Sequence, residues 1–175
     1  MPALATPPRV RSVDPTAYTP FSTFSCGGST DHEDEVDLLV GWLHAGKFDP
    51  AVVRVTEDPE TDGLVGFCVV ERRPFRTDPD TAYIALIGVS ADWRGTRLPD
   101  GGRLGAFILG DALNQIKALW HGPPMPTTWA RVARDNSASH RIFADWGYEL
   151  IPGPPDGYDT RYRPTGIGLT QSPGP

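Results

Sequence analysis

The chain has 175 residues, of which 39% are hydrophobic and 10% aromatic, so a single domain can bury a substantial core. Its formal net charge of -6 opposes broad, nonspecific binding of nucleic acids, and no apolar run reaches the roughly 18 residues of a membrane helix. The first residues show no basic segment followed by an apolar one, so we expect a soluble protein of the cytoplasm. The two cysteines and four histidines lack the spacing of metal ligands, and we expect no metal.

The amino-terminal part of the chain is rich in proline. Residues 1–22 hold five prolines and a short β-rich stretch, and we interpret them as a partly mobile arm. Residues 23–163 are expected to form one domain, and residues 164–175 a disordered tail. Within the domain, acidic residues at positions 33–35 and later apolar residues at helical spacing predict a helix that ends near Gly46.

The remainder of the domain alternates between strand and helix patterns. Two β-rich runs, 51–56 and 64–71, are separated by a turn-rich connector and predict a hairpin. The run 82–89 is almost continuously apolar, which predicts a strand buried on both faces. Further predicted elements are a long helix over 104–119, a strand over 127–133, a short helix after Asn136, and strands over 148–151 and 158–163. This order is typical of an α/β fold.

The segment that joins the strand 82–89 to the helix 104–119 has the composition of a phosphate-binding loop. Arg94 and Arg103 flank a glycine-rich turn that opens directly into the helix. The first turn of a helix leaves N–H groups without intrahelical partners, and the helix dipole adds about half a positive charge there. The sequence therefore predicts that this loop stabilises an anion.

Two motifs in this chain occur in the order and spacing of a known family. The first is Ile87-Gly88-Val89 followed by Trp93-Arg94-Gly95 and Arg103-Leu104-Gly105, and the second runs from Val132 to Tyr148. Together they resemble the signature of the Gcn5-related N-acetyltransferases (GNAT). The resemblance covers residues 64–151 and implies an α/β fold with a central mixed, mostly antiparallel sheet, splayed in the middle, with helices on both faces. It also implies an N-acetyltransferase that moves an acetyl group from acetyl-CoA to a primary amine.

The resemblance implies a site for acetyl-CoA as co-substrate. In that family the diphosphate lies on backbone amides of the loop, and the pantetheine extends along the preceding strand like an added strand. Carried over to this sequence, the cofactor-binding residues are Ile87, Gly88, Val89, Arg94, Gly95, Gly102, Arg103, Leu104, Gly105, Ala106, Asn136 and Phe143. Direct attack by the neutral amine is implied, with a backbone N–H near Val89 stabilising the oxyanion.

The chain departs from the family pattern at two places. Residues 96–102 lengthen the phosphate loop, and Arg103 stands where the family usually has Gly. Phe143 stands where many members have a Tyr that protonates the departing thiolate, and phenylalanine has no proton to donate. The two departures together are the basis of an alternative function, a catalytically silent acyl-CoA-binding or regulatory module of the same fold.

Two residues are candidates for accepting the proton of the amine. Glu71 lies at the end of the strand before the central one, and His140 lies one turn after Asn136. Each has a structural alternative: a solvated carboxylate beside two arginines for Glu71, and a surface helix histidine for His140. Asn136 is in either case expected to cap its helix.

The acceptor is not specified by the sequence. We expect a small-molecule or peptide amine as acceptor and no membrane partner; the sequence does not specify the oligomeric state, and a homodimer is kept as an open alternative. Phe24-Ser25-Cys26-Gly27 also resembles a segment of toxin-type acetyltransferases that act on charged tRNA, the one nucleic acid we keep as a partner. A nucleotide-binding protein is disfavoured, because the chain has neither a Gly-Lys-Ser/Thr loop nor Gly-x-Gly-x-x-Gly after a strand.

Overall fold

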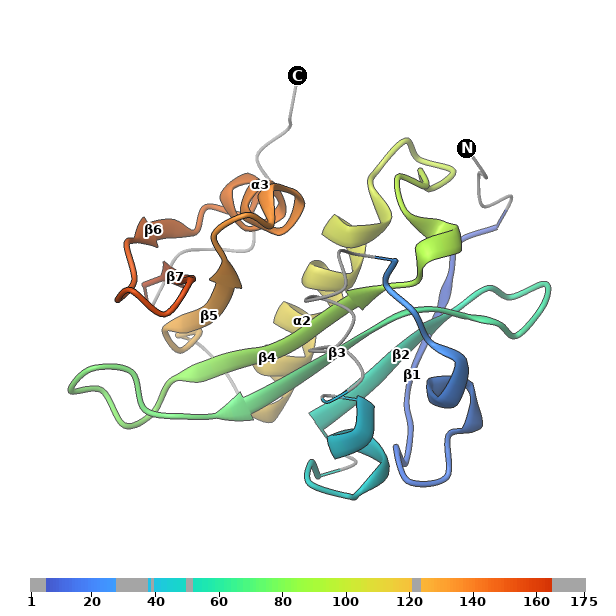
Figure 1. The fold of residues 1–175 in the computed structure, drawn as a ribbon, viewed down its shortest axis with the longest axis horizontal. Coiled ribbons are helices and arrows are strands. Elements are labelled where there is room, and N and C mark those ends of the chain that lie inside the picture. The colour runs from blue at the N-terminus through green and yellow to red at the C-terminus, as the bar shows by residue number, and fades with distance from the viewer. Residues whose placement is uncertain (1–5, 28–37, 39, 50–51, 121–123, 165–175) are drawn as a thin grey trace. The chain divides into compact units, whose positions relative to one another are not determined.

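The computed structural model describes residues 6–27, 38, 40–49, 52–120 and 124–164. The elements are β1 (Arg9–Ser12), η1 (Thr19–Thr23), β2 (Val53–Glu57), β3 (Leu64–Arg72), β4 (Ala82–Val89), η3 (Ala91–Trp93), α2 (Leu104–Leu119), β5 (Thr128–Ala133), α3 (Ser137–Asp145), β6 (Glu149–Ile151) and β7 (Tyr158–Arg163) (Figure 1). The predicted strands over 51–163 and the predicted helices over 104–119 and after Asn136 are confirmed to within the one or two residues by which such ends vary.

Seven strands form one sheet in the order β1-β2-β3-β4-β5-β7-β6. The pairs β1/β2, β2/β3, β5/β7 and β6/β7 are antiparallel, whereas β4 and β5 are parallel. The expected mixed, mostly antiparallel sheet is therefore confirmed, as is the hairpin of β2 and β3. None of the helices in the described residues is both long and apolar enough to cross a membrane.

The chain forms two compact units, and β3, β4 and α2 each contribute residues to both. The first unit comprises Met1–Val69 and Leu86–Ile108, and the second comprises Val70–Ala85 and Leu109–Pro175. The whole phosphate loop belongs to the first unit, whereas Glu71 and the α3 region belong to the second. The expected arm and tail lie partly outside the described residues, which begin at position 6 and end at 164.

Both faces of the sheet are covered in the first unit. On one face, a Cβ atom added to Gly66 of β3 would lie 2.4 Å from Ile108 Cδ1, so α2 packs directly on this strand. On the other face, the Phe67 ring packs edge-to-face against Phe21 and Phe24, with ring centroids 5.2 and 5.0 Å apart. Phe21 also contacts the ring of His44. The prediction of helices on both faces is thus confirmed, because residues 40–44 are helical.

The helix predicted to end near Gly46 falls partly outside the described residues. Positions 28–37 and 39 are not described, and the described residues 40–44 are helical. Gly46 follows with a φ of 65°. Glycine adopts this left-handed conformation without a Cβ penalty, so it ends the helix as predicted.

Burial of the strand β4 differs from the prediction. Ala82 and Ile84 are buried, but the rest of the strand is only half-buried. The reason is its pairing: β4 and β5 share only the pairs Ala82↔Thr128 and Tyr83↔Trp129. The prediction of burial on both faces is therefore wrong for most of β4, and the continuously buried strand is β3, from Val65 to Val70.

The second unit packs α3 against the sheet. The ring of Phe143 lies edge-to-face against Tyr148, with centroids 5.0 Å apart. Thr128 of β5 donates a hydrogen bond to the buried Tyr148 hydroxyl at 2.7 Å. A Cβ atom added to Gly110 of α2 would lie 3.0 Å from the Trp146 ring, so glycine at this position allows close packing. Burial raises the pKa of Tyr148, which keeps its hydroxyl neutral.

Candidate functional site

The lengthened loop between η3 and α2 is a small hairpin. Arg97 and Arg103 form an antiparallel bridge, flanked by hydrogen bonds from Leu98 N to Gly102 O (2.8 Å) and from Leu104 N to Thr96 O (3.2 Å). A turn closes the hairpin, in which the N–H group of Gly101 donates to the carbonyl of Leu98 at 2.9 Å. The extra residues therefore have a defined structure that leads straight into α2.

The first turn of α2 keeps two N–H groups available. Leu104 donates its N–H to Thr96, and Phe107 donates to the carbonyl of Arg103 at 3.0 Å. Within the described residues, the N–H groups of Gly105 and Ala106 have no backbone acceptor. Among the backbone donors predicted near the helix start, the N–H groups of Gly105 and Ala106 are thus available to bind an anion, whereas the N–H group of Leu104 is already bonded to Thr96.

Predicted donors earlier in the loop differ in availability. The N–H group of Gly102 donates to Asp100 Oδ1 at 2.9 Å, so it is used within the hairpin turn. Gly95 has a φ of 72°, and no backbone acceptor for its N–H occurs among the residues described. Arg94, Gly95 and the run Gly102 to Ala106 are brought together in one continuous loop and helix start.

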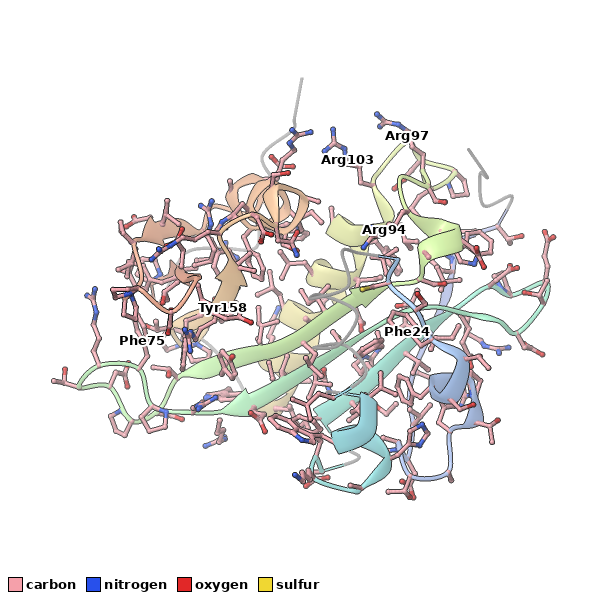
Figure 2. The ribbon with its side chains drawn as sticks, viewed as in Figure 1. Phe24, Phe75, Arg94, Arg97, Arg103 and Tyr158 are labelled. Atoms are coloured by element: carbon pink, nitrogen blue, oxygen red, sulfur yellow. The ribbon has the colours of Figure 1, made fainter. Side chains whose placement is uncertain are left out.

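Three arginines surround this loop (Figure 2). Arg94 donates a hydrogen bond to the carbonyl of Gly27, and Arg97 donates from Nη1 to the carbonyl of Gly101 at 2.8 Å. In the described part of the chain, Arg103 has neither a hydrogen bond nor an ion pair from its side chain. All three side chains are exposed, so a local positive patch exists on a chain that is acidic overall.

The strand β4 leads into this loop with one edge only partly paired. Ile87, Gly88 and Val89 lie beyond Tyr83, where the parallel pairing with β5 ends. On the other side, Ser90 N donates to Val65 O at 2.8 Å, which holds the end of β4 next to β3. Among the described residues the pairing with β5 stops at Tyr83, so the second half of β4 offers backbone groups to an added strand.

The segment Ser25 to Gly27 packs against the entrance of the loop, a role that sequence reasoning missed. Ala91 N donates to Ser25 O at 2.8 Å, and the carbonyl of Gly27 accepts from Arg94. Gly27 has a φ of 57°, and a Cβ atom there would lie 2.8 Å from Ala91 Cβ. The sequence offered two signals for this segment: its resemblance to the toxin-type acetyltransferases, and Gly27, which meets the need for both space and a left-handed backbone.

The candidate residues of the second unit have different environments. Asn136 caps α3, because its side-chain oxygen accepts from Ser139 N at 3.0 Å. Phe143 is 5% exposed and packs on Tyr148. Glu71 is half-buried at the end of β3 and forms neither a hydrogen bond nor an ion pair with other described residues.

Both ring nitrogens of His140 are occupied. Nε2 lies 3.0 Å from the carbonyl of Ala133, and Nδ1 accepts a hydrogen bond from Arg161 Nε at 3.0 Å. A carbonyl accepts and a guanidinium donates, so this pattern fits a neutral imidazole with its proton on Nε2. Within the described residues no group of three or more His, Cys, Asp or Glu side chains could hold a metal ion.

Known proteins resemble the chain in fold but not in sequence. No protein-family model and no curated protein sequence matches it. A GNAT-family acetyltransferase from Listeria monocytogenes 4b F2365 superposes with a TM-score of 0.57 at 16% identity, over 93% of this chain and 98% of that one. An acetyltransferase from Salmonella typhimurium, yncA, solved with acetyl-CoA, matches with a TM-score of 0.57 at 16% identity, over 97% and 98% of the two chains.

A third solved structure, AtaTR bound with acetyl-CoA, has a TM-score of 0.64 at 12% identity, over 90% of this chain and 93% of that one. The chain therefore has the fold of GNAT acetyltransferases, and the expected fold class is confirmed. At these identities the likeness concerns the fold alone, so the function is argued from the site.

Proposed function

We propose that this chain is an acetyl-CoA-dependent N-acyltransferase that moves an acetyl group to a primary amine. One observation carries the proposal: β4, whose second half does not pair with β5, runs into a loop and then into a helix start with free N–H groups at Gly105 and Ala106 among the described residues. A pantetheine chain can add to such an edge, and a diphosphate is stabilised at such a helix start. The acetyl-CoA complexes of two fold neighbours support this assignment.

The residues proposed to hold acetyl-CoA fall into two groups. Ile87, Gly88 and Val89 present the backbone edge for the pantetheine, and the loop and helix start present N–H groups and arginines for the phosphates. Glycine at position 88 is required by packing, because a Cβ atom would lie 2.6 Å from the ring of Phe67. The proposed contacts of Asn136 and Phe143 with the coenzyme remain part of this proposal.

Direct attack is the proposed mechanism. The amine nitrogen forms a bond to the acetyl carbon, the carbon–sulfur bond breaks, and the sulfur leaves as a thiolate that takes up a proton. A backbone N–H near Val89 is proposed to stabilise the oxyanion that forms on the acetyl oxygen, usually the largest electrostatic contribution in acyl transfer. The amine must lose one proton, which requires an acceptor within reach.

Glu71 is the better candidate for the group that accepts the amine proton, and His140 is the second candidate. The carboxylate of Glu71 has no hydrogen-bond donor bound to it among the described residues, so its lone pairs are free. His140 would first have to release Arg161 or Ala133, because both ring nitrogens are already bonded. With Phe143 in the usual tyrosine position, solvent is proposed to protonate the thiolate.

One observation favours a second candidate, a silent acyl-CoA-binding module. Position 143, where many family members have a tyrosine, holds a phenylalanine that is buried against Tyr148. The side chain at this position therefore has no proton to donate. Such a module would keep the coenzyme site and lack turnover.

Calorimetry with acetyl-CoA, followed by a thiol-release assay over a panel of amines, tests the proposal. The panel should hold small polyamines, peptide α-amines and aminoacyl-tRNA. Binding with turnover of one amine class supports the acyltransferase, and binding without any turnover supports the silent module. Absence of binding at millimolar acetyl-CoA would contradict both.

A further inference from the structure

The two arginines of the loop hairpin lie directly opposite each other. The hydrogen bonds next to them run from Leu98 to Gly102 and from Leu104 to Thr96, so Arg97 and Arg103 form a non-hydrogen-bonded pair. In such a pair the Cα atoms are about 4.5 Å apart and both side chains leave the same face. Figure 2 shows both side chains extending outward from the loop.

This pairing is unfavourable for the hairpin by itself. Like charges directly opposite each other on two strands repel. Among the described residues neither guanidinium forms an ion pair; Arg97 gives one hydrogen bond to Gly101, and Arg103 gives none. The acid within the hairpin, Asp100, accepts from the N–H group of Gly102. Several N–H donors of both guanidinium groups are therefore left for an anion.

A second observation lies at the base of the same hairpin. The side chain of Thr96 is 1% exposed, and its hydroxyl has no hydrogen-bond partner in the described residues. An unsatisfied buried hydroxyl costs free energy. Thr96 precedes Arg97 on the same strand, so its buried side chain leaves the face opposite to the arginine pair. The cost that a phosphate bound between the two guanidinium groups would offset is therefore the repulsion of the arginines.

We infer that Arg97 and Arg103 form a two-arginine clamp for a phosphomonoester, separate from the backbone donors of Gly105 and Ala106. The inference rests on the proposed function. Coenzyme A carries one phosphomonoester, the 3′-phosphate of its ribose, in addition to the diphosphate. A phosphomonoester carries nearly two negative charges at pH 7, which matches two guanidinium groups, and such charge-assisted hydrogen bonds are among the strong ones.

The clamp gives the lengthened loop a function in specificity. The backbone donors at the start of α2 serve the diphosphate, which coenzyme A and its 3′-dephospho form share. The arginine pair serves the phosphate that only coenzyme A has. The insertion at residues 96–102 therefore selects coenzyme A over its dephosphorylated precursor.

Calorimetry with two probes tests the clamp: coenzyme A and 3′-dephospho-coenzyme A. The wild-type chain should bind coenzyme A about tenfold more tightly than the dephospho form. Arg97→Gln and Arg103→Gln should each weaken coenzyme A binding and leave the dephospho form unchanged, and the double variant should abolish the preference. Arg76→Gln, an exposed arginine of the second unit, is the matched control and should change neither affinity.

The outcomes separate the clamp from the proposed function. Equal affinity of the wild type for both coenzyme forms overturns the clamp and leaves the acyltransferase proposal standing. If the variants lose equal affinity for both coenzyme forms, the arginines would be assigned to the diphosphate, and this result would also overturn the clamp. Binding of neither form contradicts the proposed function itself. Thermal unfolding of the unliganded variants provides the fold control, because relief of like-charge repulsion should leave Tm unchanged or raised.

Discussion

Arg94, the first residue of the phosphate loop, donates a hydrogen bond to the main-chain carbonyl of Gly27, 67 positions earlier in the sequence. A second bond, from Ala91 N to Ser25 O at 2.8 Å, joins the same two segments. The stretch before the first amphipathic helix therefore fixes the entrance of the loop. Loop geometry, and with it coenzyme affinity, should depend on this distant contact.

Gly27→Ala should loosen that attachment. The new Cβ atom would lie 2.8 Å from Ala91 Cβ, and the φ of 57° is unfavourable for alanine. We expect a loss of stability of about 1 to 2 kcal/mol and weaker binding of acetyl-CoA, measured by chemical unfolding and calorimetry. Gly41→Ala is the control, because this helical glycine has open space around it and the change should stabilise the chain. If the Gly27 variant binds acetyl-CoA with wild-type affinity, the attachment to Gly27 does not determine the geometry of the phosphate loop.

Gly88→Ala should disturb the strand that leads into the loop. Its Cβ atom would lie 2.6 Å from Phe67 Cε1 and 3.0 Å from Phe24 Cζ. Both rings are buried, so the substitution overpacks the core by about 1 to 3 kcal/mol. A double variant with Phe67→Leu should recover part of this loss, and unfolding of the single and double variants measures the coupling. Additive losses would indicate that the two positions do not contact each other.

The local elements were predictable because their signals are local. The helix Leu104–Leu119 follows from apolar spacing, and the Asn136 cap follows from residue type at a strand end. The lengthened loop was visible as inserted residues, but its register, which sets Arg97 opposite Arg103, depends on backbone hydrogen bonds that composition does not specify. The half-burial of β4 was missed for the same reason, since it follows from where pairing with β5 stops.

Contacts between distant segments could not be predicted from the sequence. Glu57 stands at the start of a polar, turn-rich connector in the sequence, yet it is 1% exposed and binds arginines 46 and 48 positions away. A buried carboxylate is unusual unless it is paired, and the partners lie in a proline-rich segment interpreted as mobile. The role of Gly27 was missed likewise.

Glu71→Gln should lower turnover if Glu71 accepts the amine proton. The carboxylate is half-buried and has no hydrogen-bond or ion-pair partner in the described residues, so its loss should have little effect on stability. We expect thiol release to fall by about 100-fold with unchanged affinity for acetyl-CoA. His140→Gln is the comparison. Because both ring nitrogens hold structural hydrogen bonds, this substitution should lower the free energy of unfolding and leave the rate of thiol release per folded molecule nearly unchanged. The reverse pattern would assign the base to His140.

Phe143→Tyr tests whether the missing proton donor limits the rate. The substitution adds one hydroxyl to a ring that is 5% exposed and packed on Tyr148. If this position supplies the acid, thiol release should rise by about tenfold or more at constant affinity for acetyl-CoA. An unchanged rate in a stable variant would mean that protonation by solvent is not limiting.

Glu57 should make stability depend on pH in the acid range. Its carboxylate accepts from Arg11 (2.8 and 2.9 Å), Arg9 (2.9 Å) and the Tyr18 hydroxyl (2.8 Å), which joins β1 and the segment after it to β2. Burial alone would raise the pKa of Glu57, but the hydrogen bonds from Arg11, Tyr18 and Arg9 outweigh it and lower the pKa from 4.5 to about 2.

Because the pKa of Glu57 is lower in the folded chain than in the unfolded chain, its contribution is complete above pH 4.5 and is lost as the pH falls toward about 2. The difference corresponds to about 3 kcal/mol. Unfolding by urea between pH 7 and pH 2 should therefore show a drop in this window for the wild type. Glu57→Gln should be less stable at neutral pH and should lose the part of the drop that Glu57 causes, whereas the exposed Glu60→Gln should behave like the wild type. An identical acid profile for the Glu57 variant would mean that other carboxylates cause the transition.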